Sequence, residues 1–201
     1  MTSSSKKWLI IGIAAAIPGL LLLQSLRFYR IPNESMEDTL LVGDHIAVFS
    51  LGLSKRNRGD LVTFPAPIVP TQLFIKRIIA ISGDHLRIDD KQVYVNGVVV
   101  EEPYAVYKWD RSPDERNFPT VMTDPSFPGG IEMLKNNVVN GEVVVPPNNY
   151  FVLGDNRDNT TDSRYWGFIP AESVNGFPLF IYWSSEEDAG IRWNRIFKTI
   201  H

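Results

Sequence analysis

The chain of 201 residues contains no cysteine and only three histidines. The lack of cysteine excludes disulfides, thiol nucleophiles and zinc sites built on thiolates. The histidines at positions 45 and 85 each follow an aspartate directly. Because adjacent residues of a strand point to opposite faces, neither is placed for a Ser-His-Asp triad. We therefore expect no metal and no organic cofactor, and hydrolytic chemistry would have to use another base.

An excess of positive charge is also missing, since 20 basic and 23 acidic residues give a formal net charge of -3. Proteins that bind nucleic-acid phosphates usually carry a clear surplus of Lys and Arg. We therefore expect no nucleic-acid partner. The hydrophobic share of 44% is typical of a folded domain.

Beyond residue 30 no long stretch has a helical hydrophobic period, and short runs rich in Val, Ile, Phe and Tyr recur between turn residues. Such runs predict strands at 45–50, 60–64, 74–81, 85–88, 92–95, 98–100, 142–145, 150–153 and 179–183. Asn96-Gly97 between two valine-rich runs is typical of a hairpin turn. The sequence predicts a mostly β fold, with an antiparallel core formed by 29–102 and 141–201.

Residues 103–140 are rich in proline and poor in aliphatic side chains. This composition predicts a loop-rich insertion or small flap in the β core, although a surface loop without a role fits it equally. The end of the chain, 191–201, mixes aromatic and basic residues. Packing against its own domain is favoured over contact with a membrane interface, because a short amphipathic run is weak support for the latter.

The N-terminal tail, 1–7, precedes a stretch with no formal charge from Trp8 to Leu26. As a helix this stretch would be roughly 28 Å long, which matches the hydrocarbon core of a bilayer. We predict a transmembrane anchor at 8–28. A cleaved signal is the alternative, but the small-residue cleavage pattern is missing after Leu23. The flanking charges favour a cytoplasmic N-terminus only slightly.

Two residues could form a catalytic pair. Lys76 lies in a strong strand and shares its face with Phe74 and Ile78. Desolvation there would lower its pKa and make it a usable base, whereas an edge strand would let the amine reach water. Ser35 lies in a loop shortly after the anchor, and a serine hydroxyl needs an adjacent base to attack an amide.

Four blocks resemble those of bacterial type I signal peptidases, the membrane-bound Ser/Lys proteases that remove signal peptides. The blocks are Ser35-Met36-x-x-Thr39-Leu40, Arg58-Gly59-Asp60-Leu61-Val62, Lys76-Arg77-Ile78-Ile79-x-Ile81-x-Gly83-Asp84 and the run from Gly154 to Gly167. Their order is that of the family, and the last block is long and specific. The joint match favours the buried, catalytic interpretation of Lys76.

The resemblance implies Ser35 as nucleophile and Lys76 as general base, with supporting residues in the last block. Thr160 takes the place of a hydroxyl residue that hydrogen-bonds the lysine, and Asp162 and Arg164 are expected to brace the site as an ion pair. Asp155 and Arg157 are expected to shape the loop. Substrates would be the signal peptides of exported preproteins, cleaved after small residues of the Ala-x-Ala type.

Two positions depart from the family pattern. Asp38 stands where the family often has proline, and Asn33 stands where many members have a serine that helps stabilise the oxyanion. Since a side-chain amide can donate a comparable hydrogen bond, we expect Asn33 and the Ser35 backbone N–H to form the oxyanion hole. Ile31 and Met36 are candidate substrate-pocket residues by proximity alone.

The resemblance also implies a location, in which a single-pass anchor holds the catalytic domain on the outer face of the bacterial inner membrane. Two other interpretations use the same residues. Self-cleaving repressors of the bacterial damage response have a similar dyad, but they carry a DNA-binding module in place of the apolar residues before position 30. A membrane-tethered β domain that binds peptides without catalysis is disfavoured by the presence of both Ser35 and Lys76.

Overall fold

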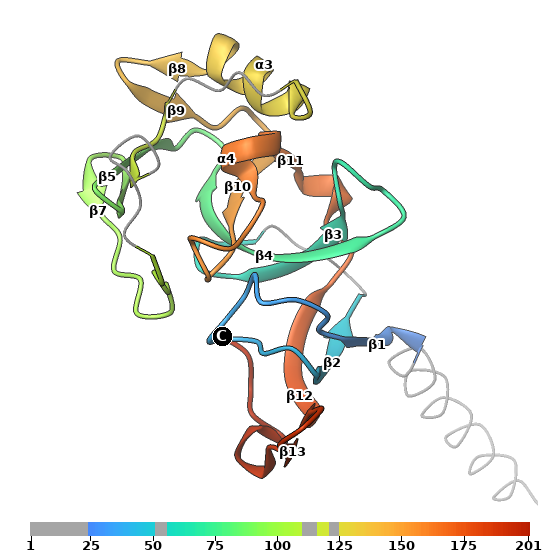
Figure 1. The fold of residues 1–201 in the computed structure, drawn as a ribbon. Helices are drawn as coiled ribbons and strands as arrows, with labels where there is room; N and C mark the ends of the chain where they lie inside the picture. The colour runs from blue at the N-terminus through green and yellow to red at the C-terminus, as the bar shows by residue number, and fades with distance from the viewer. Residues whose placement is uncertain (1–23, 51–55, 110–115, 121–124) are drawn as a thin grey trace, which may run out of the picture.

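The computed structural model describes residues 24–50, 56–109, 116–120 and 125–201. Within these ranges the strands form three antiparallel sheets, and the helices are short (Figure 1). The first sheet has the order β1-β2-β12-β13, with strands Leu26–Arg30, Asp44–Phe49, Phe177–Glu186 and Gly190–Ile191. The second has the order β11-β10-β4-β3, with strands Ile169–Pro170, Asn149–Leu153, Leu73–Ile81 and Leu61–Pro65.

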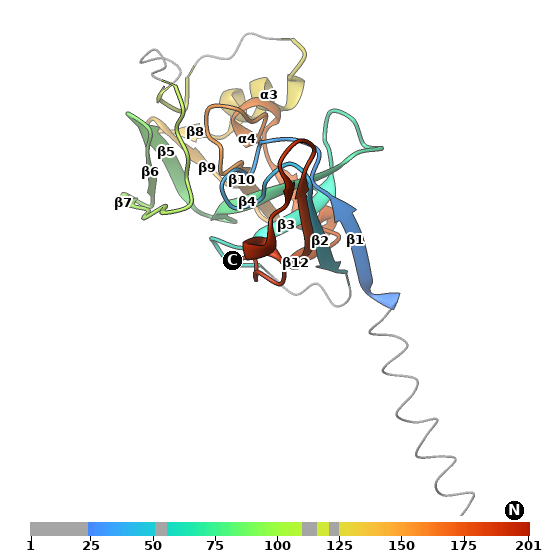
Figure 2. The same cartoon turned by 60° about the horizontal axis from the view of Figure 1, so that its bottom comes forward.

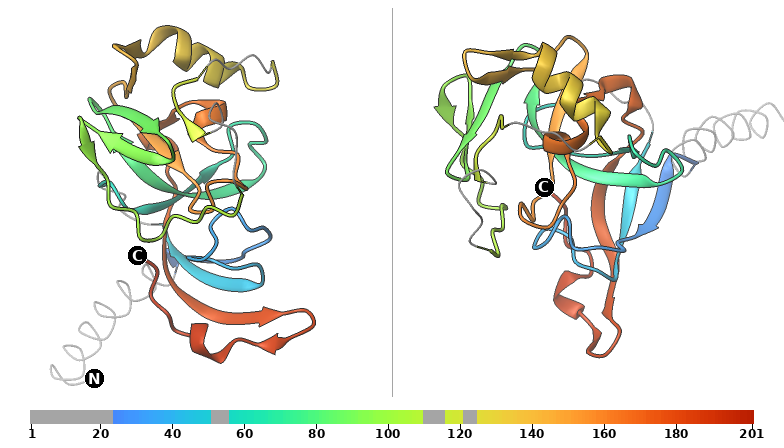
Figure 3. Two further views of the ribbon diagram at one scale, coloured as in Figure 1. Left: turned by 60° about the vertical axis from the view of Figure 1, so that its left-hand side comes forward. Right: turned by 45° about the horizontal axis from the view of Figure 1, so that its top comes forward.

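The third sheet has the order β7-β6-β5-β9-β8, with strands Val98–Val99, Gln92–Val95, His85–Asp89, Glu142–Val144 and Val138–Val139. The helices are α3 at Pro128–Asn136, α4 at Ser163–Trp166, η1 at Ala171–Ser173 and η2 at Trp193–Arg195. The second sheet lies between the other two (Figures 1 and 3). Its two neighbours bury part of its apolar surface, because Phe151 shares a core cluster with Leu86 of the third sheet and Leu61 shares one with Ile46 of the first. A further cluster of this sheet, with Phe64, packs against Trp166 of α4.

Strand β4 is paired on both edges, but not along its whole length. β3 pairs with residues 73–77, whereas β10 pairs only with residues 77–81. Residues 73–76 therefore keep one edge without a strand partner in the described part of the chain. Since an unpaired edge presents backbone donors and acceptors, it can accept an extended peptide.

Each predicted strand run corresponds to a strand of the structure, with ends that differ by a few residues. The mostly β, antiparallel expectation is thus confirmed for the described residues. The alternative in which the Lys76 amine reaches water from an edge strand is wrong: although residues 73–76 keep one unpaired edge in the described chain, the Lys76 side chain is almost fully buried and its amine hydrogen-bonds Ser35.

The end of the predicted anchor is also wrong. Residues 26–28 belong to β1, which pairs with β2 (Figure 2). The hydropathy pattern assigned these residues to the end of the anchor, but their backbone groups form the hydrogen bonds of a sheet. Most of the predicted anchor lies outside the described residues. Within the described ranges, none of the helices has the length and apolar character needed to cross a bilayer.

The segment 103–140 is less loop-rich than expected, because it contains α3 and β8. Pro128 suits the first turn of a helix, where its missing N–H costs no hydrogen bond. Gly129 packs so closely on the backbone of Trp166 in α4 that a Cβ there would lie 2.5 Å from the Trp166 carbonyl oxygen. Tertiary packing thus stabilises a nine-residue helix that its sequence pattern does not reveal.

Candidate functional site

Ser35 and Lys76 come together although they belong to different elements. Lys76 lies in β4 with a side chain that is almost fully buried, and its Nζ is 2.9 Å from Ser35 Oγ. Ser35 lies in the Ser35 turn, by which we mean residues 33–41 between β1 and β2. The distance is that of a direct hydrogen bond, so a proton can pass between the two side chains without an intervening group.

Burial changes the acidity of the Lys76 amine. Desolvation is the dominant cause and lowers its pKa from 10.5 to about 8, while the charges of Asp162 and Asp155 act in the opposite direction. Arg164 adds to the lowering. An amine with this pKa is neutral in a substantial fraction of molecules near neutral pH, and only the neutral form can accept a proton.

The Ser35 turn has no regular secondary structure, and contacts from outside hold it. Met36 is buried in the core beside Leu40, and the Leu40 N–H donates to the Met36 carbonyl oxygen. Thr39 Oγ1 donates to Asp155 Oδ2 at 2.6 Å. The N–H of Asn156 donates to the Ser35 carbonyl oxygen at 3.2 Å. The loop between β10 and α4 thus fixes the backbone that carries the Ser35 hydroxyl.

This β10–α4 loop, residues 154–162, contains a set of buried charges that are paired. Asp155 accepts two hydrogen bonds from the guanidinium of Arg77, at 2.7 and 2.9 Å. Asp162 caps α4 by accepting from the Arg164 N–H and forms an ion pair with the Arg164 side chain at 2.8 Å. Paired charges with several hydrogen bonds each give the loop a defined shape at the site.

Gly154 and Thr160 show how closely the β10–α4 loop approaches Ser35. A Cβ on Gly154 would lie 2.3 Å from Thr160 Oγ1 and 2.5 Å from the Ser35 carbonyl oxygen, so glycine is required there. Thr160 Oγ1 itself is buried and has no hydrogen-bond partner among the described residues, so the bond to Lys76 that the resemblance implied is absent from this conformation. A buried hydroxyl without a partner is costly, which leaves Thr160 available to a group that enters or moves within the site.

Asn33 lies close to Ser35 but is exposed, and its Oδ1 accepts a hydrogen bond from the Ser35 backbone N–H at 3.2 Å. The two donors expected to form an oxyanion hole are therefore adjacent. In this conformation, however, the Ser35 N–H is engaged by Asn33. A substrate carbonyl would have to replace Asn33 Oδ1 at that N–H.

A groove of about 860 Å³ opens beside Ser35 and Lys76. Its walls come from the end of β1 and the Ser35 turn, from residues 72–76 at the unpaired edge of β4, and from residues 158–161 of the β10–α4 loop. Ile31 and Met36 both line it, although most of each side chain is buried beneath the groove surface. The groove has the dimensions of a site for a short peptide segment.

Sequence reasoning missed several residues that build this site. The motif block that contains Arg77 indicated no role for this side chain, yet Arg77 forms the ion pair with Asp155. Arg157 pairs with Glu102, at 2.6 Å. A cation directly after Lys76 in a buried strand was the available signal for Arg77, because it must point to the opposite face and find an acid there. No local signal indicated Glu102, which belongs to a distant segment.

Comparison with known proteins shows relatives along most of the chain. A family model described as "Signal peptidase, peptidase S26" matches residues 5–183. Signal peptidase I of Aquifex aeolicus is 35% identical over 194 residues, which cover 79% of this chain and 76% of the relative. Signal peptidase I of Buchnera aphidicola is 28% identical, covering 96% of this chain and 83% of the relative.

Among solved structures, a signal peptidase I from Enterococcus faecalis is similar to this chain, with 30% sequence identity and a TM-score of 0.47. The similarity covers 63% of this chain and 98% of the other.

Proposed function

Because this chain belongs to the signal peptidase family, peptidase S26, we propose that Ser35 is its nucleophile and Lys76 its general base. The protein is a serine peptidase that removes signal peptides. The assignment of the two residues rests above all on the 2.9 Å between Lys76 Nζ and Ser35 Oγ in a buried site.

The reaction follows from this pair. Neutral Lys76 takes the proton of the Ser35 hydroxyl as Oγ attacks the scissile carbonyl carbon, and the lysine then gives the proton to the departing amine. This leaves an acyl-enzyme ester on Ser35. Lys76 next takes a proton from a water molecule that attacks the ester, and it returns the proton to Ser35 when the signal peptide leaves.

The groove supports binding of the substrate in an extended conformation. Residues 73–76 offer backbone groups to a peptide that adds to the edge of β4. Ile31 and Met36 form part of the apolar floor, which favours small apolar side chains near the scissile bond. Cleavage after Ala-x-Ala sequences is the specificity that fits these walls.

We assign Asn33 and the Ser35 N–H to the oxyanion hole. When the substrate carbonyl displaces Asn33 Oδ1, rotation of the amide would let Asn33 Nδ2 donate to the developing oxyanion. Replacement by alanine (Asn33→Ala) should lower kcat about 10²–10³-fold, the usual effect of removing one such donor. Asn33→Ser, which keeps a donor, should retain more activity, and a loss in kcat below threefold for Asn33→Ala would contradict the role.

Thr160, Asp162 and Arg164 support the base in this proposal. The Thr160 hydroxyl, which has no partner in the part of the chain that the structure describes, is available to hydrogen-bond the Lys76 amine once Ser35 becomes acylated and no longer offers its proton. Asp162 and Arg164 act on Lys76 in opposite directions, since Asp162 raises its pKa and Arg164 lowers it. Asp155 and Arg157 keep the shape of the β10–α4 loop.

The location is proposed from the sequence before β1. An apolar segment that ends before Leu26 would anchor the chain in the bacterial inner membrane, with a cytoplasmic N-terminus. β1 begins immediately after it, so the groove would lie near the membrane surface where the apolar part of a signal peptide emerges. Protease treatment of intact spheroplasts should then degrade the β core, and full protection would place it on the cytoplasmic side.

The decisive experiment uses the full chain in detergent with a preprotein substrate. Wild type should cleave at the signal-peptide junction, and both Ser35→Ala and Lys76→Ala should abolish cleavage. If wild type binds the preprotein without cleaving it, the peptide-binding interpretation applies. Cleavage that survives Lys76→Ala would show that another group is the base.

A further inference from the structure

Residues 102–109 follow β7 in the chain and run along the β10–α4 loop. We call them the strap. The Val106 N–H donates to the Asp155 carbonyl oxygen at 2.8 Å, and the Arg157 N–H donates to the Val106 carbonyl oxygen at 2.9 Å. These bonds form a parallel bridge between Val106 and Asn156. The strap thus pairs with the loop that holds the backbone of Ser35.

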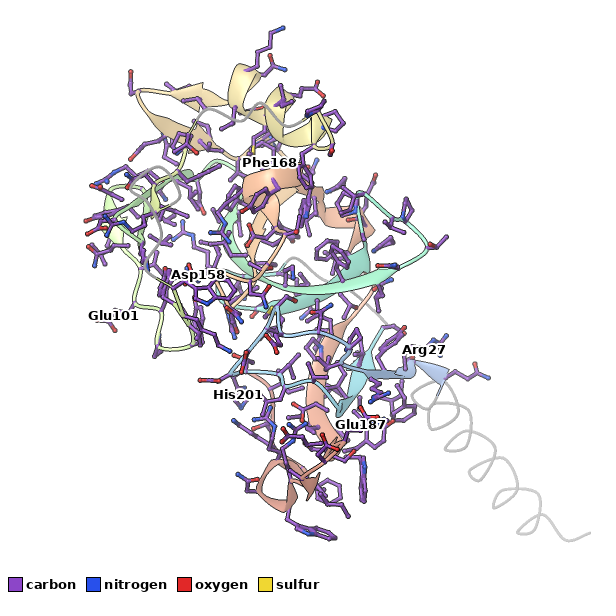
Figure 4. All side chains as sticks on the ribbon, viewed as in Figure 1. Arg27, Glu101, Asp158, Phe168, Glu187 and His201 are labelled. Carbon is purple, nitrogen blue, oxygen red and sulfur yellow. The ribbon has the colours of Figure 1, made fainter. Side chains whose placement is uncertain are left out.

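Side chains at both ends of the strap strengthen this attachment. Glu102 forms the buried ion pair with Arg157, and the backbone N–H groups of Lys108 and Trp109 both donate to Asp158 Oδ2. Figure 4 labels Asp158, which lies where the loop meets the strap. Because the contacts extend from Glu102 to Trp109, the strap has a fixed position relative to the site.

Lys108 carries the attachment across to the Ser35 turn. Its Nζ forms an ion pair with Glu37 Oε2 at 2.5 Å, and the same oxygen accepts a hydrogen bond from Asn156 Nδ2 at 3.4 Å. Glu37 is two residues after Ser35. The hydrogen bond that Lys108 donates to Glu37 raises the pKa of Lys108, and the charges of Glu34 and Asp38 add to the effect, so Lys108 is charged wherever the enzyme works.

Resting on the function proposed above, we propose that Lys108 is a positioning residue that holds the Ser35 turn in its reactive place through Glu37. The turn belongs to no helix or strand, and few of its backbone bonds are internal (Glu37 to Glu34 and Leu40 to Met36), so contacts from outside help decide where the hydroxyl lies. Small displacements of a reacting atom have large effects on rate. An ion pair as exposed as this one contributes little to global stability, so its main effect is local.

The test compares Lys108→Met with Lys135→Met, which removes an exposed lysine from α3 in the same insertion. Lys108→Met should lower kcat about fivefold, with KM within twofold and an unchanged melting temperature. Lys135→Met should match wild type. A rise in KM at constant kcat would instead mean that Lys108 contacts the substrate, and a kcat within 1.5-fold of wild type would overturn the proposal.

Charge reversal sharpens the test. Lys108→Glu should lower kcat about tenfold, because it places a carboxylate against Glu37, and adding Glu37→Lys should restore most of the loss. A double variant no better than Lys108→Glu alone would overturn the pairing.

Amide hydrogen exchange gives a readout that does not depend on cleavage. Lys108→Met should accelerate exchange at Leu40 and Leu41, whose N–H groups are hydrogen-bonded in the folded turn. If wild type failed to cleave, the proposed function would fall, yet faster exchange would still support the positioning contact. Unchanged exchange together with unchanged kcat would overturn the inference and leave the Ser/Lys assignment intact.

Discussion

Lys76 and Arg77 are neighbouring cations in β4, both almost fully buried, and their surroundings differ in kind. Arg77 donates twice to Asp155, donates to the Gly59 carbonyl oxygen and stacks on the ring of Tyr104. Lys76 forms no ion pair within the described part of the chain and has the Ser35 hydroxyl beside it. Alternation along one strand thus creates a permanently charged structural cation and a cation that can lose its proton.

The difference shows how a fold lowers the pKa of a lysine. A buried charge is tolerated when an acid neutralises it directly, as Asp155 does for Arg77. When the acids remain at a distance, desolvation dominates and the neutral form becomes accessible. The four predictions that follow test this contrast, beginning with the largest expected effect.

Lys76→Arg should reduce cleavage about 10⁴-fold or more, because a guanidinium keeps its proton at every working pH and cannot serve as a base. Initial rates with a preprotein substrate would measure the loss, and Lys135→Arg on α3 is the matched control. Activity within tenfold of wild type would show that the charge state of this side chain is irrelevant.

Asp155→Asn should destabilise the fold by about 3–5 kcal/mol, since it leaves the Arg77 guanidinium buried without its counter-charge. Urea unfolding of the full chain in detergent would measure the change. Asp89→Asn is the control, because the Arg87–Asp89 ion pair is largely exposed and its loss should cost less than about 1 kcal/mol. Equal effects of the two substitutions would mean that burial does not increase the cost of leaving Arg77 without its counter-charge.

Lys76→Met should stabilise the protein at pH 7 by about 1–3 kcal/mol, because it removes an amine whose charged form is disfavoured by burial. The folded pKa of about 8 is below the ordinary 10.5, so the unfolded chain binds more protons between these values. The cost of burying Lys76 is therefore full below pH 8 and fades as the pH rises to about 10.5. Unfolding at pH 7 and pH 10 should show the advantage of Lys76→Met shrinking, and a constant difference would contradict a lowered pKa.

The pH profile of kcat/KM should rise about tenfold per pH unit below pH 8 and level off above it, because the proposed mechanism requires neutral Lys76, whose pKa is about 8. Replacement of each of the three histidines by alanine should leave this limb in place. A limb near pH 10 would mean that desolvation does not lower the pKa of Lys76. A limb that disappears when one histidine is replaced would mean that this histidine, and not Lys76, is the titrating group.

Much of the fold could be predicted because its signals are local. The runs that became β4 and β10 are rich in β-branched and aromatic residues between turn residues, and such a pattern depends only on near neighbours. α3 was missed because its formation depends on packing against α4, where Gly129 meets the Trp166 carbonyl oxygen. β1 was missed because its hydrophobic residues continue the apolar N-terminal stretch.

The candidate site likewise has parts that the sequence predicts and parts that only the fold reveals. The resemblance of four motif blocks to signal peptidases pointed to Ser35 and Lys76, together with the supporting residues of the β10–α4 loop. It did not reveal that Asp155 would pair with Arg77 and Arg157 with Glu102. The partners are 78 and 55 residues apart in the chain, so only the folded backbone brings each acid to its arginine.

The positions of the strands along the chain and the shortage of histidines could be read from the sequence alone, because residue type and periodicity act over short distances, and the motif blocks that resemble signal peptidases pointed to Ser35 and Lys76 as the proposed reacting pair. The 2.9 Å between amine and hydroxyl, the desolvation of Lys76 and the path of the strap belong to the tertiary structure. These depend on contacts between segments that are far apart in the chain, and no local pattern encodes how such segments are brought together.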